Sequence, residues 1–120
     1  MFDHVGFNVS NFDRSLQFYR LALEPLGLTV LRQGEMWAMI GGPDGRLWIG
    51  AFGPAATPVH IAFRASSRDA VRKFHESGLA AGGRDNGGPG LREQYAPDYY
   101  AAFVLDPDGH NIEAVTTAPS

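Results

Sequence analysis

"VHIAF" (residues 59–63) and "HVGF" (residues 4–7) are two short apolar stretches, each with a histidine at or near its start. In the earlier one, Val5 and Phe7 alternate with His4 and Gly6, which is the period-two pattern of a strand with two different faces. An offset of 56 residues aligns the two stretches and gives seven identities: His4/His60, Phe7/Phe63, Ser10/Ser66, Asp13/Asp69, Phe18/Phe74, Leu23/Leu79 and Gly27/Gly83. The chain therefore contains an internal repeat, and the fold must be built from two copies of one unit.

Each copy continues from its first strand into a helix. Ser10 with Asp13, and Ser66 with Asp69, have the Ser-x-x-acid spacing of a helix start, where the hydroxyl accepts from a free backbone N–H and the carboxylate favours the positive helix end. An apolar stripe at helical spacing then runs up to Pro25, which stops the first helix: Phe12, Leu16, Tyr19 and Leu23. The second helix is expected to end at Gly82 and Gly83.

The second parts of the two copies also match, at an offset of 64 residues. "AMIGGPDGRLWIGAF" from Ala38 aligns with "AFVLDPDGHNIEAV" from Ala102, and each Pro-Asp-Gly predicts a hairpin turn. The larger offset implies an eight-residue insertion, which we assign to the glycine-rich residues 82–98 and expect to be a mobile loop at the mouth of a cleft. The predicted fold is α+β, one domain of two tandem βαβββ modules, about 1–56 and 57–120.

Composition restricts the classes of partner and site. The chain has 120 residues with 44% hydrophobic and 19% charged, and its net charge of −3 comes without any basic run, which argues against a nucleic-acid partner. No cysteine is present, so metal ligands would have to be His, Asp or Glu. No apolar stretch approaches the ~18 residues of a membrane span, and Met1 leads directly into a strand, so we expect a cytoplasmic protein with no membrane partner.

A duplicated βαβββ unit with a histidine on each first strand, closed by "DPDGHNIEAV" (residues 106–115), resembles the vicinal oxygen chelate superfamily. This group includes glyoxalases, bleomycin and fosfomycin resistance proteins and extradiol dioxygenases. The resemblance covers nearly the whole chain and implies curved sheets that line a cleft. It also implies that the metal-dependent members take ligands from the first and last strands of each module, at positions that carry over to His4, Ile49, His60 and Glu113.

Three of these four residues can bind a metal. Two neutral imidazoles and one carboxylate match the facial triad of non-haem Fe(II) and would equally accept Mn(II), Zn or Ni. The competing structural interpretation is that His4 and His60 only form hydrogen bonds at strand ends while Glu113 lies at a solvated strand edge. Strand parity would direct Gly6 and Ala62 into the cleft beside the histidines, which leaves room for a ligand. His75 and His110 are expected to be surface histidines.

Several further residues are candidates for contact with a substrate. Aromatic rings can stack on a ligand, and arginine can meet a carboxylate or phosphate. Arg64 is selected by strand parity with His60, and Gln94 and Tyr95 are selected because they lie in the inserted segment. The aromatic candidates are Trp37, Trp48, Tyr95, Tyr99 and Tyr100. The residues selected for substrate contact are Trp37, Arg64, Arg92, Gln94, Tyr95 and Tyr100.

The leading hypothesis is a metal-dependent enzyme in which His4, His60 and Glu113 hold one divalent ion that chelates two neighbouring oxygens of a small organic substrate. Glu113 would be the catalytic carboxylate, and the reaction would be that of a lyase, an isomerase or a dioxygenase. Ile49 at the fourth position argues against glyoxalase I isomerisation unless Glu113 serves alone. The alternatives are a metal-free binding protein like the bleomycin resistance proteins, and a scaffold with no small-molecule role. The resemblance also implies a homodimer, in which His4 and the His60/Glu113 pair meet across the interface or within one chain.

Overall fold

Two βαβββ units follow each other in the computed structural model, which describes residues 1–120. The first unit consists of β1 (His4–Asn8), α1 (Phe12–Leu23), the short 3-10 helix η1 (Glu24–Leu26), β2 (Thr29–Gln33), β3 (Trp37–Gly42) and β4 (Gly45–Gly50). The second consists of β5 (His60–Arg64), α2 (Arg68–Ala80), β6 (Arg84–Leu91), β7 (Tyr100–Leu105) and β8 (Asn111–Thr116). The predicted tandem modules are confirmed, and neither helix is long and apolar enough to cross a membrane.

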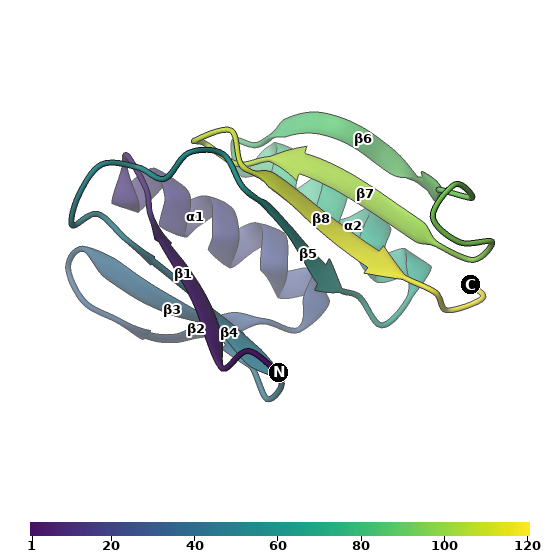
Figure 1. Cartoon of the computed structure of the whole chain (residues 1–120), viewed down its shortest axis with the longest axis horizontal. Coiled ribbons are helices and arrows are strands. Elements are labelled where there is room, and N and C mark those ends of the chain that lie inside the picture. The colour runs from purple at the N-terminus through teal and green to yellow at the C-terminus, as the bar shows by residue number, and fades with distance from the viewer.

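Each module forms its own four-stranded mixed sheet. The strand orders are β1-β4-β3-β2 and β5-β8-β7-β6, so the first strand of each module pairs in parallel with its last strand and is itself a sheet edge. Figure 1 shows both helices behind the two sheets, with β1 and β5 as neighbouring inner edges. We call the uncovered side of each sheet its open face, and the opposite side its helix face.

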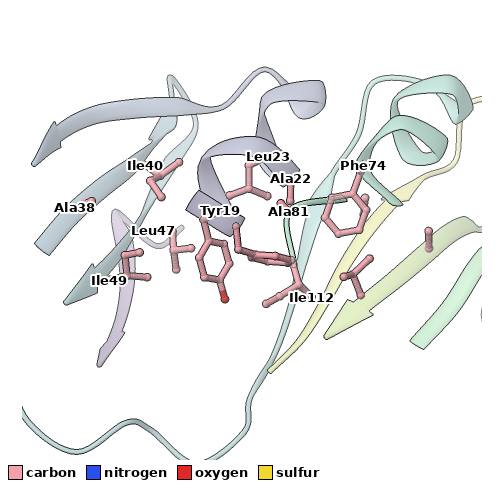
Figure 2. Packing of buried hydrophobic residues seen from close by; sticks show 14 of the residues in the cluster. Tyr19, Ala22, Leu23, Ala38, Ile40, Leu47, Ile49, Phe74, Ala81 and Ile112 are labelled. Atoms are coloured by element: carbon pink, nitrogen blue, oxygen red, sulfur yellow. The ribbon is translucent and has the colours of Figure 1, made fainter. Parts of the chain in front are cut away.

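One hydrophobic core joins the two modules through their helices. Tyr19 and Leu23 of α1 are fully buried, as is Phe74 of α2. Figure 2 shows Tyr19 and Leu23 between Ile40, Leu47 and Ile49 of the first sheet and Phe74 and Ile112 of the second module. Because the helices pack against each other as well as on their sheets, the modules share buried apolar surface, the main favourable term in folding.

The helices begin one residue later than the sequence predicted. Asn11 caps α1 by accepting from the backbone N–H of Arg14 at 3.1 Å, and Ser67 caps α2 by accepting from that of Ala70 at 3.1 Å. Ser10, the predicted cap of α1, instead forms hydrogen bonds to the second module. Its backbone N–H donates to Asp108 Oδ2 at 3.1 Å, and its hydroxyl donates to Asp108 Oδ1.

The loop between β7 and β8, residues 106–110, clamps the two modules together, and we call it the clamp loop. Buried Asp106 accepts from the hydroxyl of Tyr19 and from the backbone N–H groups of Asp108 and His110. Burial, with the nearby Asp106 carboxylate, raises the pKa of Tyr19 well above its ordinary value. The imidazole of His110 lies 4.7 Å from the Phe7 ring and is fully buried, so the expectation of a surface histidine there was wrong.

The glycine-rich segment is a strand for much of its length, not the predicted mobile loop. Residues 84–91 form β6, an edge strand paired with β7, because backbone pairing requires no side chains. Its register shifts twice, and Gly87 has a φ of 146°, a dihedral that glycine accepts without strain. The extra length is divided between β6, which has 8 residues against 5 in β2, and the loop of residues 92–99, which corresponds to residues 34–36 in the first module.

Candidate functional site

The register of the second sheet determines which side chains share its open face. Ala62 of β5 and Phe103 of β7 both pair with Glu113 of β8, so these three residues point to the same side. His60 precedes Ala62 by two positions and therefore points that way too. Ile112 takes the opposite direction and is fully buried in the core. The predicted division into a cleft-facing and a core-facing set holds for this sheet.

His60 and Glu113 meet on this open face, as predicted. His60 Nε2 lies 2.7 Å from Glu113 Oε1, and the hydroxyl of Tyr99 donates to the other carboxylate oxygen. The Glu113 side chain is 2% exposed, whereas that of His60 is 53% exposed. The alternative of Glu113 at a solvated edge is wrong, because β8 lies inside the sheet between β5 and β7. The Glu113 carboxylate is thus buried, and its histidine partner is exposed to solvent.

Tyr99 was an aromatic candidate for substrate contact but was not among the selected site residues, whereas Tyr100 was. Tyr100 lies on the helix face, where the guanidinium of Arg68 sits 5.0 Å from its ring and Arg72 Nη1 donates to its hydroxyl at 3.3 Å. The prediction for Tyr100 was therefore wrong. Strand alternation back from Phe103 assigns Tyr100 to the side opposite Phe103 and was the available signal. Burial, followed by the hydrogen bond to Glu113, raises the pKa of Tyr99 to about 12.

Two further predicted residues lie beside the His60–Glu113 pair. The Arg92 guanidinium is 5.4 Å from the centroid of the Phe103 ring, and the His60 ring is 6.2 Å from the same ring. Tyr95 packs edge-on against Tyr99 at 5.2 Å. Gln94 is exposed in the same loop and forms no hydrogen bond within the chain. A cation and exposed aromatic rings thus border the buried carboxylate, a combination suited to an oxygen-rich organic ligand.

His4 lies apart from that pair, on the open face of the first sheet. Its Nδ1 is 2.8 Å from Asp3 Oδ1, and Asp3 Oδ2 accepts from Arg46 Nη2 at 2.7 Å. The hydrogen bond from His4 and the charge of Arg46 lower the pKa of Asp3. No group of three or more His, Asp or Glu side chains in the chain is arranged to hold a metal. The structure therefore brings together two of the three predicted ligands within one chain.

The fourth family position is Trp48 rather than Ile49. Gly6 pairs with Trp48 just as Ala62 pairs with Glu113, so Trp48 is the counterpart of Glu113. The clamp loop is one residue longer than the matching turn in the first module, which shifts the last strand by one and misled the sequence alignment. Ile49 is fully buried on the helix face. The first module therefore still has no carboxylate at the fourth position, as expected when Ile49 was assigned there.

Aromatic side chains cover the rest of the first open face. Trp48 stacks on Phe52 with ring centroids 6.1 Å apart, and both border a shallow hollow of about 290 Å³ with Trp37, Met39 and Arg32. Trp37, predicted to contact substrate, therefore lies on the first sheet and not with His60. Arg64 ends β5 and lines a different pocket, between the modules. The remaining histidine, His75, is partly buried and pairs with Asp85 at 2.9 Å.

The donors on the second open face are compatible with a divalent ion. Imidazole nitrogen and carboxylate oxygen are the ligand types that Fe, Mn, Zn and Ni accept, and His60 Nε2 and Glu113 Oε1 converge on one point from adjacent strands. Tyr99 holds the second carboxylate oxygen, which is the kind of supporting hydrogen bond that orients metal ligands. Two protein ligands are fewer than the three typical of catalytic sites, so an ion bound here would need a third donor from elsewhere.

Comparison with known proteins gives one family. Residues 1–114 match the family model described as Glyoxalase/Bleomycin resistance protein/Dioxygenase superfamily. A glyoxalase/bleomycin resistance protein from Albidiferax ferrireducens T118 is 30% identical, with a TM-score of 0.84 over 96% of this chain and 97% of that one. No curated protein matches the sequence significantly.

More distant solved structures share the fold. A glyoxalase/bleomycin resistance protein/dioxygenase family enzyme from Burkholderia phytofirmans PsJN is 14% identical, with a TM-score of 0.76 over 97% of this chain and 98% of that one. A glyoxalase-related enzyme from Fulvimarina pelagi is 19% identical, with a TM-score of 0.72 over 96% and 86% of the two chains.

Proposed function

Since the chain belongs to the glyoxalase/bleomycin resistance protein/dioxygenase superfamily, we propose that it is a metal-dependent enzyme acting on a small organic substrate with two neighbouring oxygens. The observation that carries the proposal is the contact of 2.7 Å between His60 Nε2 and the buried Glu113 carboxylate. Burying a carboxylate is costly unless it is paired, and this one is paired with an exposed metal-ligand type rather than with arginine or lysine.

The third ligand in this proposal is His4 of a second copy of the chain. His4 is 54% exposed, and its Nε2 forms no hydrogen bond, so it is available to a partner. The inner strands β1 and β5 are both sheet edges, which leaves the rows of backbone groups beside His4 and His60 without a partner strand. A two-fold dimer that faces the first open face of one copy with the second open face of the other completes two identical sites.

Within this site the chain's own residues have separate roles. Glu113 would ligate the ion through Oε1 and, as the buried carboxylate beside it, would accept a substrate proton. Tyr99 orients Glu113 and, because its pKa is about 12, stays a proton donor at neutral pH. Arg92 and Tyr95, which border the pair, would contact a substrate's carboxylate and its flat surface. The bound ion would act as a Lewis acid toward the substrate oxygens.

Metal analysis of untagged protein tests the proposal. After reconstitution with Fe(II), Mn(II), Zn or Ni and removal of excess ion, one ion per chain is expected in the wild type and none in His60→Ala or Glu113→Gln. His75→Ala is the matched control, because His75 is also paired with a carboxylate, Asp85, at 2.9 Å. Wild type that retains no more ion than Glu113→Gln contradicts the metal site. Lactoylglutathione and catechol assays on loaded protein then distinguish isomerase from dioxygenase chemistry.

A metal-free binding protein is the second candidate, and Trp48 favours it. Where the second module has Glu113, the first has Trp48 in an aromatic hollow with Trp37 and Phe52. Such a surface binds flat ligands by stacking and needs no ion. This candidate predicts that an aromatic ligand quenches tryptophan fluorescence equally in wild type and Glu113→Gln, whereas the enzyme proposal predicts that ligand binding depends on Glu113.

A further inference from the structure

A pocket of about 560 Å³ lies between the two modules, where β1 begins and β5 ends, and its lining includes His4 and Ala62. Half of its lining residues are hydrophobic, and they come from β1, β5 and the segment after α1: Val5, Leu26, Leu28, Ile61 and Phe63 are among them. Figure 1 shows the end of β5 beside the end of α1, with the start of β1 on the neighbouring sheet near the N-terminus. The volume falls within the ~300–1,000 Å³ of small-molecule sites.

The pocket exists because the two copies of the repeat carry different side chains in the turn before their last strand. At the other end, the clamp loop of the second module fills the corresponding space with Asp106, Asp108 and His110. The matching turn of the first module has Gly42, Asp44 and Gly45 at these places, according to the pairing of the flanking strands. Two of the three filling side chains are therefore missing, and Gly42, Asp44 and Gly45 line the pocket instead.

Ser66 retains the donors that its counterpart uses. Ser10 binds the Asp108 carboxylate through both its backbone N–H and its hydroxyl. Ser66 occupies the same position in the second module, directly before the helix cap, and it lines the pocket. Neither its N–H nor its hydroxyl forms a hydrogen bond within the chain. Asp44, the counterpart of Asp108, lines the same pocket but makes no hydrogen bond to Ser66, so the donors of Ser66 are left free for a ligand.

We propose that this pocket binds an aliphatic carboxylic acid, with the carboxylate on Ser66 and the chain among the apolar residues. Arg64, two residues before Ser66, lines the pocket and has no ion-pair partner, whereas Arg46 is already paired with Asp3. Asp44 is the one acidic residue of the lining and belongs to the β3–β4 turn, whereas Arg64 ends β5 and Ser66 follows it in the segment before α2. The charges therefore favour the acid group at Ser66 and the tail toward Leu26 and Leu28.

Calorimetric titration of the full chain with decanoate tests the proposal. One decanoate per chain is expected, with 1-decanol bound at least tenfold more weakly because the carboxylate makes charge-assisted hydrogen bonds. Ser66→Ala should weaken decanoate binding about tenfold, since a hydrogen bond to a charged group is lost. Ser10→Ala, the same substitution in the filled copy, should leave the affinity unchanged. Equal affinity for decanol, or equal loss in both variants, overturns the proposal.

Gly45→His provides a second, independent variant. It introduces the side chain that His110 places in the other module, at a position where an added Cβ meets nothing closer than 3.9 Å. The imidazole should occupy the pocket and abolish decanoate binding while the far-ultraviolet circular dichroism stays unchanged. Undiminished binding in this variant locates the acid elsewhere and contradicts the proposal. If the wild type binds no decanoate and Gly45→His alters the oligomeric mass, a second copy covers the pocket, which also contradicts it.

Discussion

At the scale of single residues, the second open face is organised around one buried carboxylate. Glu113 would be unstable there without partners, and His60 and Tyr99 provide them from β5 and from the residue before β7. The sequence predicted the first partner, because the repeat aligned His60 with His4. It did not select the second partner, because Tyr99 lies outside the repeat and has no counterpart in the first module.

Tyr99→Phe should change the pH dependence of stability at high pH. The folded-state pKa of Tyr99 is about 12 and the ordinary value is 10.0, so the folded chain holds this proton more tightly than the unfolded chain. The resulting stabilisation is fully present below pH 10 and is lost as pH rises toward 12. Urea unfolding at pH 9, 10 and 11 should show a smaller decline for Tyr99→Phe than for wild type. Parallel declines would mean that folding does not raise the pKa of Tyr99.

At the scale of elements, the internal repeat explains most of the fold. The places where the two copies differ in length explain the predictions that were wrong. Alternation and the 56-residue offset located the strands that carry His4 and His60, because both copies bury the same face. The 64-residue offset assigned Ile49 to the fourth position, since identical Pro-Asp-Gly triplets concealed one extra residue in the clamp loop. A change of one residue reverses the face of a strand, so the alignment selected a core residue in place of Trp48.

Asp106→Ala should destabilise the chain by about 3 kcal/mol or more, because it leaves the Tyr19 hydroxyl and two backbone N–H groups buried without an acceptor. The matched control is Asp44→Ala, in the corresponding turn of the first module. Asp44 is exposed and accepts no hydrogen bond, so its loss should cost within about 0.5 kcal/mol. Denaturant midpoints measure both. A similar cost for the two variants would show that the clamp loop does not hold the modules together.

At the scale of the whole molecule, the two modules form one folding unit. A single core extends from the first sheet through both helices to the second sheet. Two-state unfolding is usual for a domain of this size when its core is continuous. The sequence predicted one domain from length alone, whereas the contact between modules depends on the clamp loop and on helix packing, which no local pattern encodes.

Phe74→Ala tests this cooperativity. Phe74 is fully buried in the second module, and its truncation should cost about 3–5 kcal/mol. Both tryptophans, Trp37 and Trp48, are in the first module and report on its unfolding by fluorescence. The fluorescence midpoint should therefore fall by as much as the midpoint from circular dichroism. An unchanged fluorescence midpoint would mean that the first module unfolds independently.

The central claim is a metal site shared between two copies, with His4 from one copy and His60 and Glu113 from the other. Its most direct test is metal binding by an equimolar mixture of His4→Ala and Glu113→Gln chains. Each variant by itself is expected to bind no ion. After subunit exchange, half of the dimers contain both variants, and each of these has one intact site by two-fold symmetry, so about a quarter of the wild-type ion content should return. A mixture that binds no more ion than either variant alone contradicts the shared site.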